Sequence, residues 1–178
     1  MRSISGLVLA ALLSVSGAVN AASSEVIDAK VREALAIFAA QSPAGVELME
    51  KAAGVLVFPD VIKMGFGVGG QYGEGSLLID GEPVAYYSTA AGSFGFQIGA
   101  QFKAELILFM TEGALERFRS SKGWKAGVDG SVALVTVGAG GIIDTKTVQQ
   151  PIVGFVFSNK GLMANLTLEG AKITKIDR

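Results

Sequence analysis

The chain has 178 residues and a formal net charge of −1; 50% of its residues are hydrophobic and 17% are charged. This composition predicts one compact globular domain with a substantial core. Histidine and cysteine are absent, which excludes disulfides, thiolate or imidazole metal sites, cysteine nucleophiles and histidine-based triads. We expect no cofactor and no nucleic-acid partner, and attraction to an anionic surface must come from locally clustered basic residues.

The first segment, Met1–Ala21, has the features of an export signal. Arg2 supplies a positive start, Ile4–Val19 is mostly apolar, and small or tolerated residues precede a cut after Ala21. The apolar run is shorter than the ~20 strongly apolar residues that a membrane span needs. We therefore expect residues 1–21 to be removed and residues 22–178 to form one domain in the periplasm; an uncleaved anchor helix is the alternative.

Two helices are predicted next. Apolar residues recur at three- and four-residue spacing from Val26 to Phe38, which indicates a helix with one apolar face. Acids outnumber bases on its polar face, so packing against a sheet is favoured over lying on a membrane. Ser42 and Pro43 end this helix and begin a second one, which stops at Gly54.

Strand patterns dominate the remainder of the chain. An Asp80-Gly81 hairpin turn separates two of them, and Thr111 can cap a short helix that ends near Phe118. The predicted strands are Val55–Phe58, Leu77–Ile79, Val84–Ser88, Ala104–Met110, Ser131–Val137, Ile152–Phe157, Leu162–Leu168 and Lys172–Ile176. Together these elements predict an α+β domain, in which N-terminal helices pack on a curved, mostly antiparallel, glycine-rich sheet or half-closed barrel.

Glycine falls on alternate positions in the stretch Lys63–Gln101, beginning with Gly65, Gly67 and Gly69. Because side chains alternate along a strand, one face there carries only hydrogens. Such a face suggests a very close neighbour: another backbone, a helix, a coiled barrel wall or a ligand. Residues 93–102 partly repeat the pattern of residues 66–72, which suggests that two similar strands lie side by side.

The same glycines also match a dinucleotide-binding fingerprint. That fingerprint requires the glycine turn to open a helix whose N-terminus holds the pyrophosphate. Here Gln71–Ser76 is a poor helix opening and a strand pattern follows. We therefore interpret the match as accidental.

Several motifs in order along residues 29–176 resemble the SYLF lipid-binding domain family, in a form typical of exported bacterial members. The motifs are AAGVLVFP at 52–59, GFGVGGQYGEG at 65–75, YYS at 86–88, GSFGFQIG at 92–99, SNKGL at 158–162 and LEG at 168–170. The resemblance implies an α+β domain that binds phosphoinositides or other anionic lipids. It also implies eukaryotic relatives that act at membranes and on actin.

The densest basic segment is the candidate lipid-binding site, and it contains the sole tryptophan. Tryptophan favours the headgroup zone, and each cation near an anionic leaflet contributes about 1 kcal/mol. The predicted site comprises Arg117, Phe118, Arg119, Lys122, Trp124 and Lys125, with a second basic group of Lys63, Lys103, Lys146 and Lys160. The alternative is a solvated helix end with both aromatic residues in the core.

No catalytic constellation is evident. Glu74 has no obvious acid–base partner, and Ser88, Thr89 and Ser93 have no histidine to activate them. The sequence therefore predicts non-catalytic binding of anionic phospholipid at an envelope membrane. The alternative is a structural module whose glycine-rich face receives a strand or helix of a protein partner.

Overall fold

The computed structural model describes residues 22–136, 147, 149–158, 168 and 170–178, without the side chains of residues 65–68, 93–100 and 136. The predicted signal segment and Lys146 and Lys160 lie outside the described residues, as does most of the predicted strand Leu162–Leu168. Among the described residues no helix is both long and apolar enough to cross a membrane.

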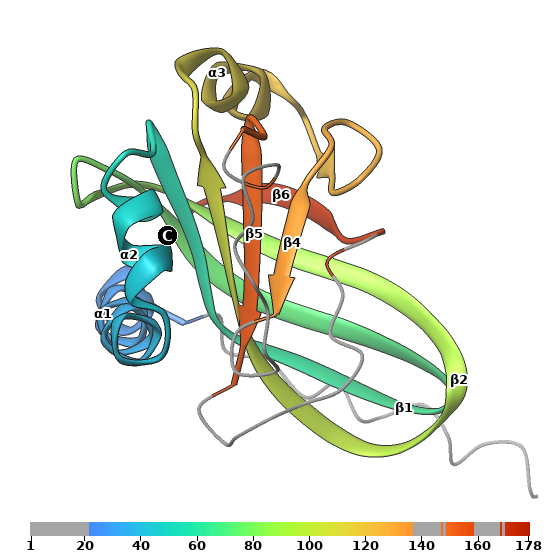
Figure 1. Ribbon diagram of the computed structural model, residues 1–178. Coiled ribbons are helices and arrows are strands. Elements are labelled where there is room, and N and C mark those ends of the chain that lie inside the picture. Colours follow the sequence, from blue (N-terminus) through green and yellow to red (C-terminus); the bar gives the residue numbers. More distant parts are fainter. Residues whose placement is uncertain (1–21, 137–146, 148, 159–167, 169) are drawn as a thin grey trace, which may run out of the picture.

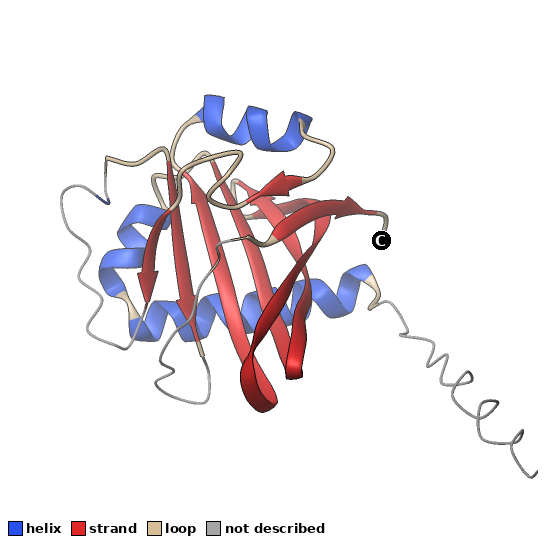
Figure 2. Cartoon of the chain, turned by 90° about the vertical axis from the view of Figure 1, so that its right-hand side faces the viewer, coloured by secondary structure: helices blue, strands red, loops and turns tan. Residues whose placement is uncertain are grey.

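The described elements form one curled sheet with helices around it, so the predicted α+β class is confirmed (Figure 1, Figure 2). The strand order is β3-β6-β2-β5-β4, and β1 pairs with β2. Between the described strands, β4 and β5 pair in parallel and the other pairings are antiparallel. The strands are β1 Gly54–Ile79, β2 Glu82–Phe109, β3 Trp124–Lys125, β4 Ala133–Thr136, β5 Ile152–Phe157 and β6 Lys172–Ile176.

The first two strands are much longer than the sequence predicts. Separate short strands were expected between residues 55 and 110, including two glycine-rich ones, but β1 and β2 form one continuous hairpin. The turn lies at Asp80 and Gly81, both at positive φ, as the Asp-Gly signal predicts. The expected breaks appear instead as register shifts, among them one between Phe58 and Val61 and one between Gly65 and Gly67. Such bulges bend a ribbon without ending it.

Glycine-rich segments of β1 and β2 lie opposite each other, which confirms the predicted side-by-side arrangement. Gly65 pairs with Gly99, Gly67 with Gly95, and Gly70 with Gly92. Here the hairpin curls, and its two ends return toward each other (Figure 1).

Glycine is also required where the curled hairpin meets itself. A Cβ atom at Gly75 would lie 1.9 Å from the Val57 carbonyl oxygen, and one at Gly73 would lie 2.8 Å from the Asp60 carbonyl oxygen. At these two glycines the close neighbour that the sequence predicted is the backbone of the same strand, β1. This contact closes the half-barrel.

The helices cover the two faces of the sheet, as Figure 2 shows. α1 (Ser24–Gln41) and α2 (Pro43–Met49) pack on one face, and α3 (Glu112–Ser120) packs on the other. In α1 the predicted apolar face is buried, and the Phe38 ring lies 5.0 Å from that of Phe155. Val26, expected on that face, is 46% exposed. The buried residues of the helix are Ile27, Val31, Ala34 and Phe38.

The N-terminal ends of α2 and α3 are capped as the sequence predicts. Ser42 accepts a hydrogen bond from the Gly45 N–H, and Thr111 accepts one from the Ala114 N–H. The cap at Thr111 fixes where α3 begins, and therefore where its basic last turn lies.

Candidate functional site

The two aromatic residues of the predicted lipid site are core residues. Phe118 is 1% exposed and Trp124 3%. The Phe118 ring lies 4.6 Å from Phe109 and 5.7 Å from Trp124, so these rings attach α3 to the sheet. The prediction that they contact a headgroup zone is wrong. α3 has no other apolar face, so Phe118 is needed inside the core to pack the helix on the sheet.

The four predicted cations beside these rings are exposed. Arg117 and Arg119 occupy the last turn of α3, where positive charge suits the helix dipole, and Lys122 and Lys125 follow. The structure adds two exposed lysines from β6, Lys172 and Lys175. We call the six residues Arg117, Arg119, Lys122, Lys125, Lys172 and Lys175 the cationic patch.

Strand pairing brings Lys172 next to Lys125, whereas Lys175 lies on the opposite face of β6. Lys125 of β3 lies directly opposite Lys172 of β6. The Lys172 Cε atom also lies 2.9 Å from the position of a Cβ on Gly123, beside Lys122. Like charges directly opposite each other destabilise a strand pair.

The patch cations are not neutralised within the described part of the chain. None of the six makes an ion pair there, and the described ion pairs involve Lys30, Lys103 and Arg178 instead. The acids nearest in sequence are Glu112, Glu116, Asp129, Glu169 and Asp177, of which Glu169 lies outside the described residues. A carboxylate oxygen of Asp129 accepts the Lys125 backbone N–H at 2.7 Å, which holds the turn after β3.

Of the predicted second basic group, the structure describes Lys63 and Lys103. Lys103 is 5% exposed and its Nζ atom lies 2.8 Å from Glu105, which is fully buried, so its predicted lipid contact is wrong. Burial raises the pKa of Glu105, although the charge and hydrogen bond of Lys103 oppose the shift. Of the others, Lys63 is partly exposed on β1 and Lys160 lies outside the described residues.

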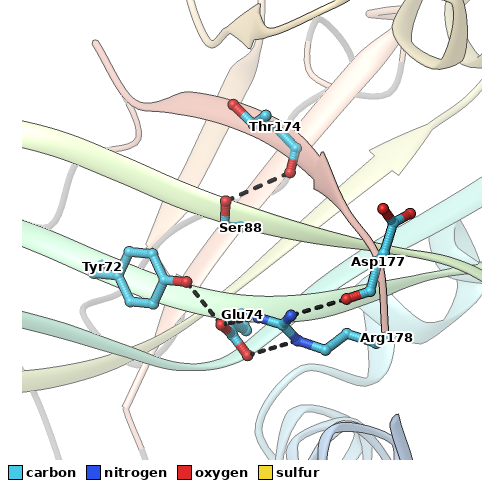
Figure 3. A network of polar contacts seen from close by, with 6 residues as sticks. All are labelled: Tyr72, Glu74, Ser88, Thr174, Asp177 and Arg178. Carbon is cyan, nitrogen blue, oxygen red and sulfur yellow. Dashed lines mark hydrogen bonds and ion pairs between the residues drawn. The ribbon is translucent and has the colours of Figure 1, made fainter. Parts of the chain in front are cut away.

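Glu74 is a hydrogen-bonding residue within β1 (Figure 3). Its carboxylate accepts the Tyr72 hydroxyl at 2.7 Å and forms an ion pair with Arg178. Burial raises the pKa of Glu74, but the Arg178 hydrogen bonds and charge and the Tyr72 hydrogen bond outweigh it, so the pKa lies below its ordinary value. A carboxylate held charged in this way is a structural link rather than a proton carrier.

Reactive groups are not assembled elsewhere among the described residues. The Ser88 hydroxyl donates to the Thr174 carbonyl oxygen at 3.5 Å (Figure 3), and its neighbours offer no base. Groups of three or more acidic side chains that could hold a metal ion do not occur in the described ranges.

The fold and its surface together define a class: a helix-backed, curled β-hairpin domain that presents unpaired cations on one end. A family model described as "Ysc84: Las17-binding protein actin regulator" matches residues 90–178, half of the chain. The chain belongs to this family, the SYLF family that the sequence motifs predict. The matched half contains the whole cationic patch, and no curated protein matches the chain.

The family is one of binding domains, linked to actin-regulatory and lipid-binding roles. A binding role is consistent with the site, whose distinguishing feature is exposed charge rather than a reactive group.

Proposed function

We propose that this domain binds anionic phospholipid without catalysis, at the periplasmic surface of an envelope membrane. The predicted export signal supports the compartment, and the family's lipid-binding role supports the ligand class. By family resemblance the preferred headgroups are phosphoinositide-like, and the chemistry that the patch recognises is a phosphate group.

The observation that carries this proposal is the opposed Lys125–Lys172 pair within a patch that has no ion-pair partner in the described structure. Holding two ammonium groups across one strand pair costs stability in water. A phosphate between them would remove that cost, because each ammonium group donates hydrogen bonds to its oxygens.

The magnitude fits reversible attachment. Six cations at about 1 kcal/mol each give at most about 6 kcal/mol, which corresponds to a dissociation constant no lower than some tens of micromolar. The four cations recognised from the sequence alone would give only about millimolar binding. Because the neighbouring aromatic residues Phe118 and Trp124 are buried in the core, the attraction is mainly electrostatic and should weaken with salt.

A protein partner is the second candidate, and the family description as an actin regulator favours it. The form first predicted, in which the glycine-rich face receives a foreign strand, fails at Gly73 and Gly75 because the chain's own backbone fills that space. At Gly92, by contrast, nothing lies within 4 Å of an added Cβ atom, so a partner segment could still approach the glycine-rich face there.

Vesicle co-sedimentation tests the proposal. The protein should sediment with vesicles that contain phosphatidylglycerol and remain in solution with pure phosphatidylcholine, and binding should fall between about 0.05 M and about 0.5 M salt. Binding that ignores headgroup charge or salt would contradict the proposal. A stoichiometric protein recovered from the envelope, without lipid dependence, would favour the second candidate.

A further inference from the structure

A large cavity lies where the curled hairpin approaches the end of the chain. Its volume is about 720 Å³, within the range of about 300–1,000 Å³ typical of small-molecule sites. The described residues that line it are Ile62, Met64, Gly70, Gln71, Tyr72, Glu74 and Arg178. It is separate from the cationic patch, because none of these residues belongs to the patch.

The walls of this cavity are mainly apolar. Ile62 and Met64 come from the first part of β1. Gly70, Tyr72 and Glu74 occupy alternate positions in its second part, so these three residues share one face of the strand. Met64 is 60% exposed and Tyr72 46%, which leaves two large apolar side chains in water beside the cavity. Exposed apolar surface of this kind marks a ligand groove or a contact with membrane.

The polar groups of the cavity are gathered at one side and already neutralise each other. Glu74 binds both the Tyr72 hydroxyl and Arg178, and their side chains are seen to converge in Figure 3. The Glu74 and Arg178 side chains are only 12% and 17% exposed. A charged headgroup would have to displace this pair, whereas a hydrocarbon chain would not.

We infer that the cavity takes one acyl chain of a membrane phospholipid. This inference rests on the proposed function for the source of the chain. Strand β6 connects the two sites: Lys172 belongs to the patch and Arg178 to the cavity, and six residues of extended chain span about 20 Å. The patch then holds the domain at the headgroups while the cavity accepts a chain drawn from the leaflet.

The inference is tested by filling the cavity from Gly70. A Cβ at Gly70 meets only the Ala91 carbonyl oxygen, at 3.4 Å, so a larger side chain fits the backbone and points where Tyr72 and Glu74 point. The series Gly70→Ala, Gly70→Leu and Gly70→Phe adds increasing volume. Val84→Phe is the matched control, because Val84 is exposed and does not line the cavity.

The probe is palmitoyl lysophosphatidylglycerol below its micelle concentration, titrated by calorimetry. We expect one-to-one saturable binding that weakens along the Gly70 series, by at least about tenfold for Gly70→Phe, and by less than about twofold for Val84→Phe. Thermal unfolding of each variant verifies that it is folded. Equal affinity across the series, or absence of saturable binding, overturns the inference.

The same measurement separates this inference from the proposed function. The headgroup alone, glycerophosphoglycerol, should not compete with the lysolipid for the cavity. If the lysolipid binds and the Gly70 series weakens it, the cavity is established even where anionic vesicles fail to sediment the protein. If the protein binds anionic vesicles but all Gly70 variants bind the lysolipid equally well, the proposed function stands and the acyl-chain site is refuted.

Discussion

Gly75 shows how one position without a side chain permits the half-barrel to close. An added methyl group would meet the Val57 carbonyl oxygen at 1.9 Å and the carbonyl carbon at 2.7 Å, and backbone atoms cannot rotate away. We therefore expect Gly75→Ala to cost more than about 3 kcal/mol of unfolding free energy, or to prevent folding.

Gly92 is the matched control for this prediction. Nothing lies within 4 Å of a Cβ placed there, so Gly92→Ala should change stability by less than about 1 kcal/mol. Urea denaturation followed by circular dichroism measures both. Similar effects of the two substitutions would show that β1 does not pack on itself.

Glu74 gives stability a pH dependence. Its pKa in the folded state lies below the ordinary value, so its contribution is present above the unfolded pKa of about 4.3 and is lost as pH falls through the folded pKa. Glu74→Gln should therefore cost about 2 kcal/mol near neutral pH. Below about pH 4 its difference from the wild type should shrink.

Denaturation at several pH values measures this difference, with Glu82→Gln as the control. Glu82 is exposed at the start of β2 and makes no ion pair with a described residue. A gap between Glu74→Gln and wild type that stays constant from pH 3 to pH 7 would mean that the Glu74–Arg178 link is not formed.

At the scale of elements, β2 carries an ion pair into the core. Lys103 and Glu105 occupy one face of the strand, and Glu105 Oε2 has no hydrogen-bond partner in the described structure. Replacing one partner by an uncharged residue should cost about 3–5 kcal/mol of unfolding free energy, because the charge of the other is then buried without a partner. Replacing both by apolar residues should recover most of that loss.

A double-mutant cycle with Lys103→Met and Glu105→Leu tests this. The double variant should be more stable than either single variant, with a coupling of at least about 2 kcal/mol from urea unfolding. Additive losses would contradict the pairing.

The sequence predicted element types better than element lengths. The apolar period of α1, the Asp80-Gly81 turn and the Thr111 cap depend on neighbouring residues, so they could be read directly. The continuity of β1 and β2 could not be read, because glycine and proline usually end strands and here bend them through bulges instead.

At the scale of the whole molecule, four of the six patch cations were within reach of the sequence. Arg117, Arg119, Lys122 and Lys125 are contiguous and were predicted as a cluster. Lys172 joins them only through the pairing of β3 with β6, which no local pattern reveals. Lys103 was misassigned because its buried partner Glu105 lies two residues on, a spacing that reads as an ordinary alternating strand.

The resulting account assigns separate tasks to separate regions. Glycine contacts close the half-barrel, the aromatic rings of Phe109, Phe118 and Trp124 hold α3 on it, and the helix end then presents charge beside β6. In this arrangement the aromatic residues position the cations and do not themselves meet the membrane.

Charge reversal at the opposed lysines tests this account most directly. Lys125→Glu with Lys172→Glu keeps like charges opposite each other but inverts their sign. Arg32→Glu with Lys51→Glu changes the net charge equally at exposed positions outside the patch. In co-sedimentation with phosphatidylglycerol vesicles, the patch variant should lose at least about tenfold in affinity and the control variant much less. Equal losses, or no loss in the patch variant, would contradict a membrane contact at this surface.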